Sequence, residues 1–364
     1  MRNNQLHIDF KLNGISFSSV EELLVYSKTL SYSTHNFLIE WFSADAVVYV
    51  STSGSTGTPK LIKLKKEFIR NSALATGAFF ELPAKTTALL CMSTDYIAGK
   101  MMLVRAIVLG WHLDVVAVVS NPLKGLGKQY NFSAMVPMQL QNSLSEIDMV
   151  EKLIVGGGIV SKELESQIQA VSTEVFATFG MTETITHIAV KKLNHLSSRV
   201  LANGLNNYQT LPNIFISQDQ RGCLVIDAPM VSEELLITND VVALISEKEF
   251  KWLGRFDTVI NSGGVKLHPE EIEKKIAAVL TQRFFVAGAA DDKLGEKLIL
   301  VVEANVVSSQ DEKDLKEKLK HLLLHATNLT KYEQPKSIFV VAGFVETETK
   351  KIQRNKTLEL LFKS

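Results

Sequence analysis

The sequence predicts an α/β protein: a large N-terminal α/β domain that includes a small β-rich subdomain, followed by a small α+β domain. Three observations support this. Between residues 46 and 179, short apolar runs alternate with helical patterns, as in a sheet that carries helices on its faces. From about 190 to 253, short strands separated by turns replace that alternation. Beyond residue 258 a further set of helices and strands begins, with a pattern of its own.

The elements are expected in a definite order. Residues 8–43 are expected to form one short strand and two helices, with 18–22 as a capped helix start. Strands are then expected at 46–50, 61–66, 87–92, 113–119, 132–136, 152–155 and 174–179. The helices among them are expected at 67–80, 98–109, 137–144 and 161–171. The last segment is expected to hold a helix from 269, strands near 284–289 and 297–303, a helix at 311–325 and a strand near 337–341.

The composition is that of a globular protein. The chain has 364 residues, of which 46% are hydrophobic and 21% charged, which suits a packed core. Basic and acidic residues both number 39, so nothing points to nucleic acid or an acidic membrane surface. Cys91 and Cys223 lack metal-ligand or redox spacing and are expected to be buried and reduced. No secretory core or membrane-spanning run is recognisable, so a cytoplasmic location is expected.

A hydroxyl-rich loop, residues 51–60, lies between two predicted strands. Glycines let backbone N–H groups converge on an anion, while hydroxyls and a lysine add donors and charge. A phosphate grip and a polar hairpin fit this composition about equally well. It is not a Walker loop, because Pro59 precedes Lys60 and strand-like sequence follows. The candidate phosphate-binding residues are Thr52, Ser53, Gly54, Ser55, Thr56, Gly57 and Lys60.

Three later segments also follow apolar runs. Gly156, Gly157 and Gly158 suit either a flexible turn or the close approach of a planar base. The segment 179–184 carries one acid between two threonines and by itself suits a solvated loop. The segment 236–240 ends in an aspartate and by itself favours a surface turn. Ligands of α/β sheets bind beyond the carboxyl ends of the strands, so the loops after the large domain's strands could converge on one rim.

In this order the segments resemble the adenylate-forming superfamily, which contains acyl-CoA synthetases, luciferases and peptide-synthetase adenylation domains. The resemblance covers most of residues 51–354. It implies ATP as substrate, with the hydroxyl-rich loop on its phosphates and the glycine segment beside adenine. It places the aromatic ring of Phe179, which precedes Gly180, against adenine, the Thr182 hydroxyl on phosphate and Glu183 on Mg²⁺. Asp240 would take the ribose hydroxyls.

The C-terminal part continues the resemblance. It implies a hinge at 254–258 between an N-terminal AMP-binding domain, 1–253, and a mobile C-terminal domain, 259–364. Arg255 would contact ribose or phosphate, and Asp257 would be the pivot. Gly263 and Gly264 would line the tunnel for the CoA thiol, and Lys351 would serve adenylation, with a basic tail as the rival interpretation of its segment. The sequence departs from the family pattern at Asn239, Thr258 and Lys350.

The implied reaction joins a carboxylic acid to CoA through an acyl-adenylate. The short first domain and the segments at 132–140 and 180–187 look like bacterial o-succinylbenzoate–CoA ligases of menaquinone synthesis. A second carboxylate on the substrate needs a cation or several donors, for which Lys100, Arg105 and His187 are candidates. The alternatives are a ligase for another aryl or acyl acid, an adenylation enzyme that loads a carrier protein, and an inactive nucleotide-binding scaffold.

Overall fold

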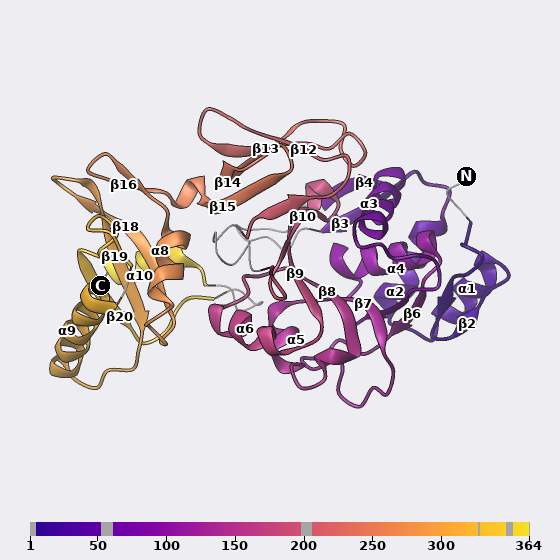
Figure 1. Ribbon diagram of the computed structural model, residues 1–364, viewed down its shortest axis with the longest axis horizontal. Coiled ribbons are helices and arrows are strands. Elements are labelled where there is room, and N and C mark those ends of the chain that lie inside the picture. The colour runs from indigo at the N-terminus through magenta and orange to yellow at the C-terminus, as the bar shows by residue number, and fades with distance from the viewer. Residues whose placement is uncertain (1–4, 52–60, 198–205, 327, 347–351, 364) are drawn as a thin grey trace. The chain divides into compact units, whose positions relative to one another are not determined.

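The computed structural model describes residues 5–51, 61–197, 206–326, 328–346 and 352–363 (Figure 1). The candidate residues from Thr52 to Lys60 and Lys351 lie outside this part. The contacts within the chain divide it into two units. Unit 1 comprises Met1–Ser217, Val225–Ile237 and Leu244–Lys251, and unit 2 comprises Gln218–Leu224, Thr238–Ala243 and Trp252–Ser364.

The main sheet of unit 1 confirms the predicted α/β class. Its strands are β1 (Lys11–Leu12), β2 (Ile15–Ser16), β5 (Thr87–Leu90), β6 (His112–Val115), β7 (Tyr130–Met135), β8 (Val150–Val155), β9 (Glu174–Gly180), β10 (His187–Lys192) and β11 (Tyr208–Thr210). They lie in the order β11-β10-β9-β8-β7-β5-β6-β1-β2. The pairs from β9 to β1 are parallel, whereas β2, β10 and β11 pair antiparallel with their neighbours.

Helices cover this sheet because their apolar faces match its buried strands. They are α1 (Val20–Ser27), α2 (Tyr32–Phe42), α3 (Lys66–Phe79), α4 (Ile97–Leu109), α5 (Pro137–Asn142) and α6 (Lys162–Gln167). Leu140 of α5 and Leu164 of α6 share one buried cluster with Leu153 and Val155 of β8. The Ser19 side chain caps α1 by accepting from the Glu22 N–H, which confirms the predicted capped start.

The strands that flank the hydroxyl-rich loop form a separate antiparallel pair. They are β3 (Val47–Ser51) and β4 (Leu61–Lys65), with Val47 opposite Lys65 and Ser51 opposite Leu61. Both strands were predicted from their apolar patterns. Four more strands, whose residues are shared between the units, are β12 (Phe215–Gln218), β13 (Cys223–Asp227), β14 (Leu236–Leu244) and β15 (Glu249–Arg255).

Unit 2 holds a second sheet with helices on both faces. Its elements are β16 (Ile260–Ser262), β17 (Val265–Leu267), α8 (Pro269–Ile276), β18 (Phe284–Asp291), β19 (Gly295–Glu303), α9 (Ser309–Ala326), β20 (Ser337–Val341) and α10 (Arg354–Lys363). The order is β17-β16-β19-β18, and β20 pairs parallel with β19. Alternate residues of β19 point to opposite faces of the sheet. Leu298 and Leu300 share a cluster with α8 and α9, whereas Ile299 shares one with α10.

Several elements differ from the sequence-based expectation. Residues 8–43 contain two short strands, β1 and β2, where one was expected, and the helix expected at 161–171 ends at Gln167. The strand expected at 113–119 ends at Val115, because its partner β5 ends at Leu90 and offers nothing further to pair with. Helix α10 was not expected, since no element was predicted beyond residue 341 and its lysines had only supported the rival interpretation of the Lys351 segment. Its Leu358 and Leu361 nevertheless pack against the sheet of unit 2.

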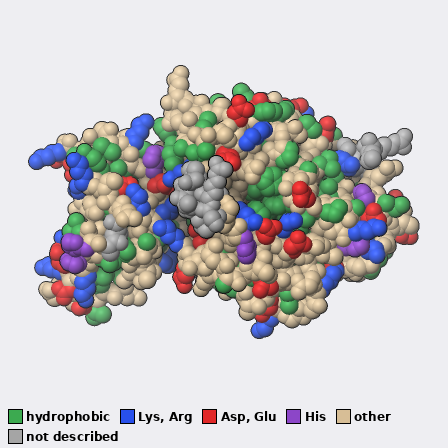
Figure 2. Space-filling model, viewed as in Figure 1, with side chains coloured by type: hydrophobic (Ala, Val, Ile, Leu, Met, Phe, Trp, Pro, Cys, Tyr) green, Lys and Arg blue, Asp and Glu red, His purple; other side chains and the backbone are tan. Residues whose placement is uncertain are grey.

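The distribution of charged side chains and the state of the two cysteines agree with what the composition predicted. Basic and acidic side chains are interspersed on the face shown in Figure 2. Cys91 and Cys223 are free and buried, as expected. Among the described residues, no helix combines the length and apolar character that crossing a membrane requires.

Candidate active site

In unit 1 the carboxyl ends of β8 and β9 bring two of the predicted nucleotide-binding segments together. The strands pair in parallel, so the glycines at 156–158 leave the sheet beside the end of β9 (Figure 1). Thr178 Oγ1 donates to the Val155 carbonyl over 3.1 Å, and a Cβ on Gly156 would lie 2.6 Å from that hydroxyl. Gly157 has φ of +76°. These positions therefore favour glycine for its small size and its backbone freedom.

The segment after β9 is held by Gly180 and Thr184. A Cβ on Gly180 would lie 2.2 Å from the Thr186 carbonyl oxygen, a distance that no side chain tolerates. Thr184 is buried, accepts from the Met181 N–H over 3.0 Å and lies 2.7 Å from the Thr186 carbonyl. Thr184 thus stabilises the turn, so the side chains of its two predecessors are not needed to hold it.

Those predecessors are Thr182 and Glu183, in a short 3₁₀ helix at Thr182–Thr184. Thr182 is half-buried and Glu183 is exposed. No described residue donates a hydrogen bond to the Glu183 carboxylate, so its oxygens are available. A carboxylate oxygen is the ligand type that Mg²⁺ prefers, so an exposed Glu183 is compatible with the predicted metal role, which stays a prediction.

Phe179, the predicted adenine contact, belongs to an aromatic cluster. Its ring lies edge-on to Tyr208 at 5.6 Å and to Phe250 at 5.1 Å, and the rings of Tyr208 and Phe250 stack at 5.4 Å. Burial raises the pKa of Tyr208 to about 12. The cluster fixes the Phe179 ring. Sequence reasoning missed its two other members, because no local motif surrounds them.

Arg105 and His187 are both buried in unit 1. Arg105 is 1% exposed and donates from Nε to Thr76 Oγ1 over 3.3 Å, while no residue that the structure describes accepts from its Nη2. No acidic side chain of the described residues pairs with it. Desolvation lowers the pKa of Arg105 to about 9. A buried cation without a counter-ion is costly, and a bound anion would relieve that cost.

His187 is a second buried polar side chain of unit 1, and it lies near enough for the charge of Arg105 to act on it. It is 5% exposed, and its Nε2 has no hydrogen-bond partner within the described part of the chain. Burial, and then the charge of Arg105, lower the pKa of His187 well below its usual value, so the ring is neutral at pH 7. His187 lines a cavity of about 260 Å³ together with Ser72, Thr184 and Leu211.

Lys100, the third predicted pocket residue, reaches different neighbours. Its ammonium lies 5.2 Å from the Phe37 ring centroid and 3.5 Å from the Tyr49 carbonyl oxygen. Burial lowers its pKa, although Glu40 and Asp95 oppose that effect. The structure therefore buries Arg105 and His187 in unit 1, where the charge of Arg105 acts on the His187 ring, and gives Lys100 different neighbours.

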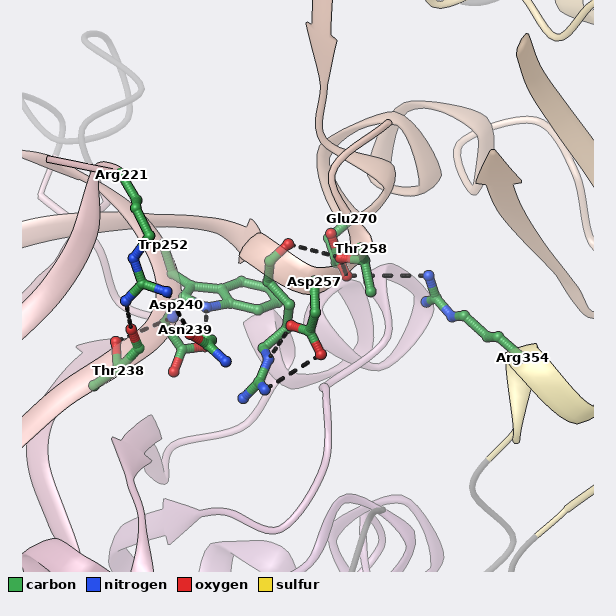
Figure 3. A network of polar contacts seen from close by, with 10 residues as sticks. Arg221, Thr238, Asn239, Asp240, Trp252, Asp257, Thr258, Glu270 and Arg354 are labelled. Carbon is green, nitrogen blue, oxygen red and sulfur yellow. Dashed lines mark hydrogen bonds and ion pairs between the residues drawn. The ribbon is translucent and has the colours of Figure 1, made fainter. Parts of the chain in front are cut away.

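In unit 2 the predicted ribose segment lies inside β14, so the surface turn that its composition favoured is wrong. Strand alternation buries Thr238 and Asp240 on one face and exposes Asn239 on the other. Arg221 donates from Nη1 to Asn239 Oδ1 over 2.9 Å and from Nη2 to the Thr238 carbonyl over 3.0 Å (Figure 3). The family usually has glycine where Asn239 stands, and a glycine could not accept this bond.

Asp240 is 8% exposed and accepts from the Trp252 indole N–H at Oδ1 over 2.8 Å (Figure 3). Burial raises the pKa of Asp240, while the Trp252 hydrogen bond and Arg255 act in the opposite direction. The partner Trp252 was missed by sequence reasoning, since it lies twelve residues away on another strand.

The predicted hinge residues form a short chain of polar contacts in unit 2 (Figure 3). Arg255 Nε lies 3.0 Å from Asp257 Oδ1, in an exposed ion pair. The Thr258 hydroxyl lies 2.8 Å from the Arg255 carbonyl oxygen and 3.1 Å from Glu270 Oε1. Arg354 in turn lies 4.0 Å from Glu270. The roles of Arg255 in nucleotide binding and of Asp257 as pivot stay predictions.

Gly263 and Gly264 form the two-residue turn between β16 and β17. Ser262 pairs with Val265 across the turn, and the two glycines have φ of +57° and +81°. Positive φ at both central positions is the type I′ geometry that closes a tight hairpin, which explains the glycines structurally. Their predicted place in a thiol tunnel stays a prediction.

Comparison with known proteins shows which family the chain belongs to. Residues 18–204 match the AMP-binding enzyme family over more than half of the chain. The chain belongs to this family. An acyl-CoA synthetase (AMP-forming)/AMP-acid ligase II-like protein from Dyadobacter fermentans is 35% identical in sequence over 93% of this chain and 98% of its own, with a TM-score of 0.59.

Further relatives include enzymes named for one substrate, 2-succinylbenzoate. The 2-succinylbenzoate–CoA ligase of Listeria monocytogenes is 26% identical over 95% of this chain and 75% of its own length. The o-succinylbenzoate CoA synthetase of Bacillus subtilis, solved with its acyl-adenylate intermediate, shares the fold with a TM-score of 0.70 at 19% identity, covering 93% of this chain and 80% of its own. The family match includes the hydroxyl-rich loop, the glycine segment and the Phe179–Glu183 segment of this AMP-binding enzyme.

Proposed function

We propose that this AMP-binding enzyme is an ATP-dependent acid–CoA ligase that acts on 2-succinylbenzoate. The observation that carries the proposal is the recurrence of that activity among curated relatives that span nearly the whole chain, from Listeria monocytogenes and from Enterococcus faecalis, the latter at 23% identity over 95% of this chain. The proposed location is the cytoplasm.

The reaction has two halves. In the first, a carboxylate oxygen of the acid attacks the α-phosphorus of ATP, the bond to pyrophosphate breaks, and an acyl-adenylate forms. In the second, the CoA thiolate attacks the acyl carbon, and AMP leaves with the electrons of the acyl–oxygen bond. Repulsion between anions and their positioning dominate the first barrier, so fixed donors and cations are the expected tools.

The proposed roles follow the candidate site. The hydroxyl-rich loop with Lys60 holds the β- and γ-phosphates, and Thr182 contacts phosphate. Mg²⁺, when bound, offsets phosphate charge, and Glu183 would be its protein ligand. Asp240 accepts hydrogen bonds from the ribose hydroxyls. Lys351 bridges the acid and the α-phosphate during adenylation.

Arg105 and His187 are the proposed site for the carboxylate that does not react. The substrate carries one carboxylate on its ring and one at the end of its succinyl chain. An anion beside Arg105 would satisfy the open Nη2 donor and supply the missing counter-charge. The neutral His187 ring can donate from Nε2, which also lacks a partner.

The test is a screen of carboxylic acids with ATP, Mg²⁺ and free CoA, read by mass spectrometry of the CoA esters. The proposal expects 2-succinylbenzoyl-CoA as the dominant product. A different preferred acid would make the protein another aryl- or acyl-CoA ligase. Pyrophosphate release without any CoA ester would indicate loading of a carrier protein, and the absence of both would indicate a nucleotide-binding scaffold.

A further inference from the structure

Among the described residues, side-chain hydrogen bonds engage one oxygen of Asp240. Its backbone lies in β14, where the Asp240 N–H donates to Thr238 Oγ1 over 3.0 Å, and that hydroxyl donates to the Leu224 carbonyl over 2.8 Å. Oδ1 accepts from the Trp252 indole. No described residue donates to Oδ2. A carboxylate offers about four lone-pair positions, so most of its accepting capacity remains open.

Trp252 differs from the partner that a buried carboxylate usually has. A guanidinium would bind both oxygens and neutralise the charge. The indole offers one neutral donor, so it fixes the plane of the carboxylate while leaving its charge and second oxygen available. The nearest candidate for a competing cation, Arg255, instead directs its Nε to Asp257 over 3.0 Å.

The indole is itself held in place. Trp252 is half-buried in β15, next to β14 in the sheet order, and the Lys274 ammonium lies 5.7 Å from its ring centroid. On the far side of the segment, Arg221 holds the Thr238 carbonyl and the Asn239 side chain. The segment 238–240 is thus fixed from both sides before any ligand binds.

We infer that Trp252 is a positioning residue that sets the Asp240 carboxylate to accept two neighbouring hydroxyls of the ribose through Oδ2 and the open positions of Oδ1. The inference rests on the proposed ribose role of Asp240. Loss of the indole donor would let the carboxylate rotate, so the ribose hydroxyls would have to order it again at a cost in affinity.

The test compares two nucleotides by titration calorimetry, without acid or CoA. ATP carries both ribose hydroxyls, whereas 2′,3′-dideoxy-ATP carries neither. Trp252→Phe keeps an aromatic ring and removes the N–H. We expect about tenfold weaker binding of ATP by this variant, as for loss of a hydrogen bond to a charged group. Binding of dideoxy-ATP should change by less than about twofold.

Trp111→Phe is the matched control. Trp111 is fully buried in unit 1, and its indole N–H has no hydrogen-bond partner, so this change removes a donor that makes no bond. The ratio of the two affinities should stay at the wild-type value. Asp240→Ala should abolish the preference for ATP, and adding Trp252→Phe to it should have no further effect.

A second measurement needs no folding-sensitive variant. In ¹⁵N-tryptophan-labelled wild-type protein, the Trp252 indole resonance should move on adding ATP and stay in place on adding dideoxy-ATP. A Trp252→Phe variant that keeps the wild-type affinity ratio, or an indole resonance that responds equally to both nucleotides, would overturn the inference. The proposed ligase activity is measured separately through its CoA ester, so either idea can fail while the other stands.

Discussion

Replacing Arg105 by methionine should make the protein more stable and its binding of the dicarboxylate weaker. Methionine fills a similar volume and removes the buried charge. The Thr76 hydroxyl that loses Arg105 as donor still donates to the Ser72 carbonyl over 3.0 Å, so no new unpaired group arises there. A structural arginine would give the opposite result for stability, because its removal would leave partners unpaired.

The stability gain can be estimated from the desolvation of the guanidinium. Its pKa falls from 12.5 to about 9, and each tenfold change in the ionisation constant corresponds to about 1.4 kcal/mol, which gives a cost of about 5 kcal/mol. The hydrogen bond to Thr76 returns a part of that. Exchanges of buried ionic groups for apolar ones stabilise by about 1–4 kcal/mol, and we expect Arg105→Met to fall in this range.

The binding loss follows from the same geometry. Charge-assisted hydrogen bonds contribute about 1.5–3 kcal/mol, so the variant should bind 2-succinylbenzoate at least about tenfold more weakly. An analogue without the ring carboxylate, 3-benzoylpropionate, should bind the variant and the wild type alike. Affinities are measured by calorimetry and stability by urea unfolding, with Lys100→Met as the comparison because it removes another cation of the same helix.

Stability and affinity together decide whether Arg105 binds the second carboxylate. Higher stability with a selective loss of the dicarboxylate supports an anion site at Arg105. Lower stability with unchanged affinity for 2-succinylbenzoate would refute the reasoning, since Arg105 would then have a structural partner. If Lys100→Met alone reduced the affinity for the dicarboxylate, the second carboxylate would bind at Lys100 instead.

Three further predictions concern other parts of the chain. Gly180→Ala would place a Cβ 2.2 Å from the Thr186 carbonyl oxygen, so both half-reactions should fall by more than about tenfold, measured against Gly127→Ala, where a Cβ meets nothing within 4 Å. Burial raises the pKa of Glu273 to about 6 despite its pairing with Arg354. The folded protein therefore holds that proton more tightly than the unfolded chain, and the resulting stabilisation is present below about pH 4.5 and lost as the pH rises through 6. Glu273→Gln should remove it, so the difference in unfolding free energy between variant and wild type should change by about 2 kcal/mol between pH 4 and 7, in favour of the variant at pH 7; a pH-independent difference would contradict this. Lys351→Ala should abolish pyrophosphate release but spare thioester formation from supplied acyl-adenylate, and equal loss in both would contradict the division of labour.

Much of the fold could be predicted from the sequence, because apolar runs and helix-start residues lie within single elements. The apolar run of β8 and the proline-and-acid start of α8 lie within one element each, and both elements form where predicted. The failures have a different cause. The strand from 113 stopped early because its neighbour β5 did, and α10 was not predicted because its apolar residues find their partners about sixty residues upstream in β18 and β19. Such limits are set by pairing across the chain, which local patterns do not contain.

The site shows the same division. Motif order indicated Phe179, Glu183 and Asp240, but not the side chains that hold them. Tyr208 lies outside every motif and Trp252 lies just before the hinge segment, and each is recognised only through the ring or carboxylate that it contacts. Composition offered Lys100, Arg105 and His187 as separate candidates for the second carboxylate. It could not show that Lys100 and Arg105 extend from α4 to different neighbours.

The two described departures from the family pattern are each matched by a partner elsewhere in unit 2. Asn239 stands where glycine is usual, and its amide oxygen accepts from Arg221. Thr258 stands where a second acid is usual, and its hydroxyl lies 3.1 Å from Glu270 Oε1, whose other oxygen is buried without a partner. An aspartate at 258 would bring a second negative charge against Glu270 and could offer it no donor unless protonated. Asn239→Gly and Thr258→Asp should therefore each lower the free energy of unfolding. Adding Glu270→Gln to Thr258→Asp should restore it, because the glutamine removes the repulsion and supplies an amide donor.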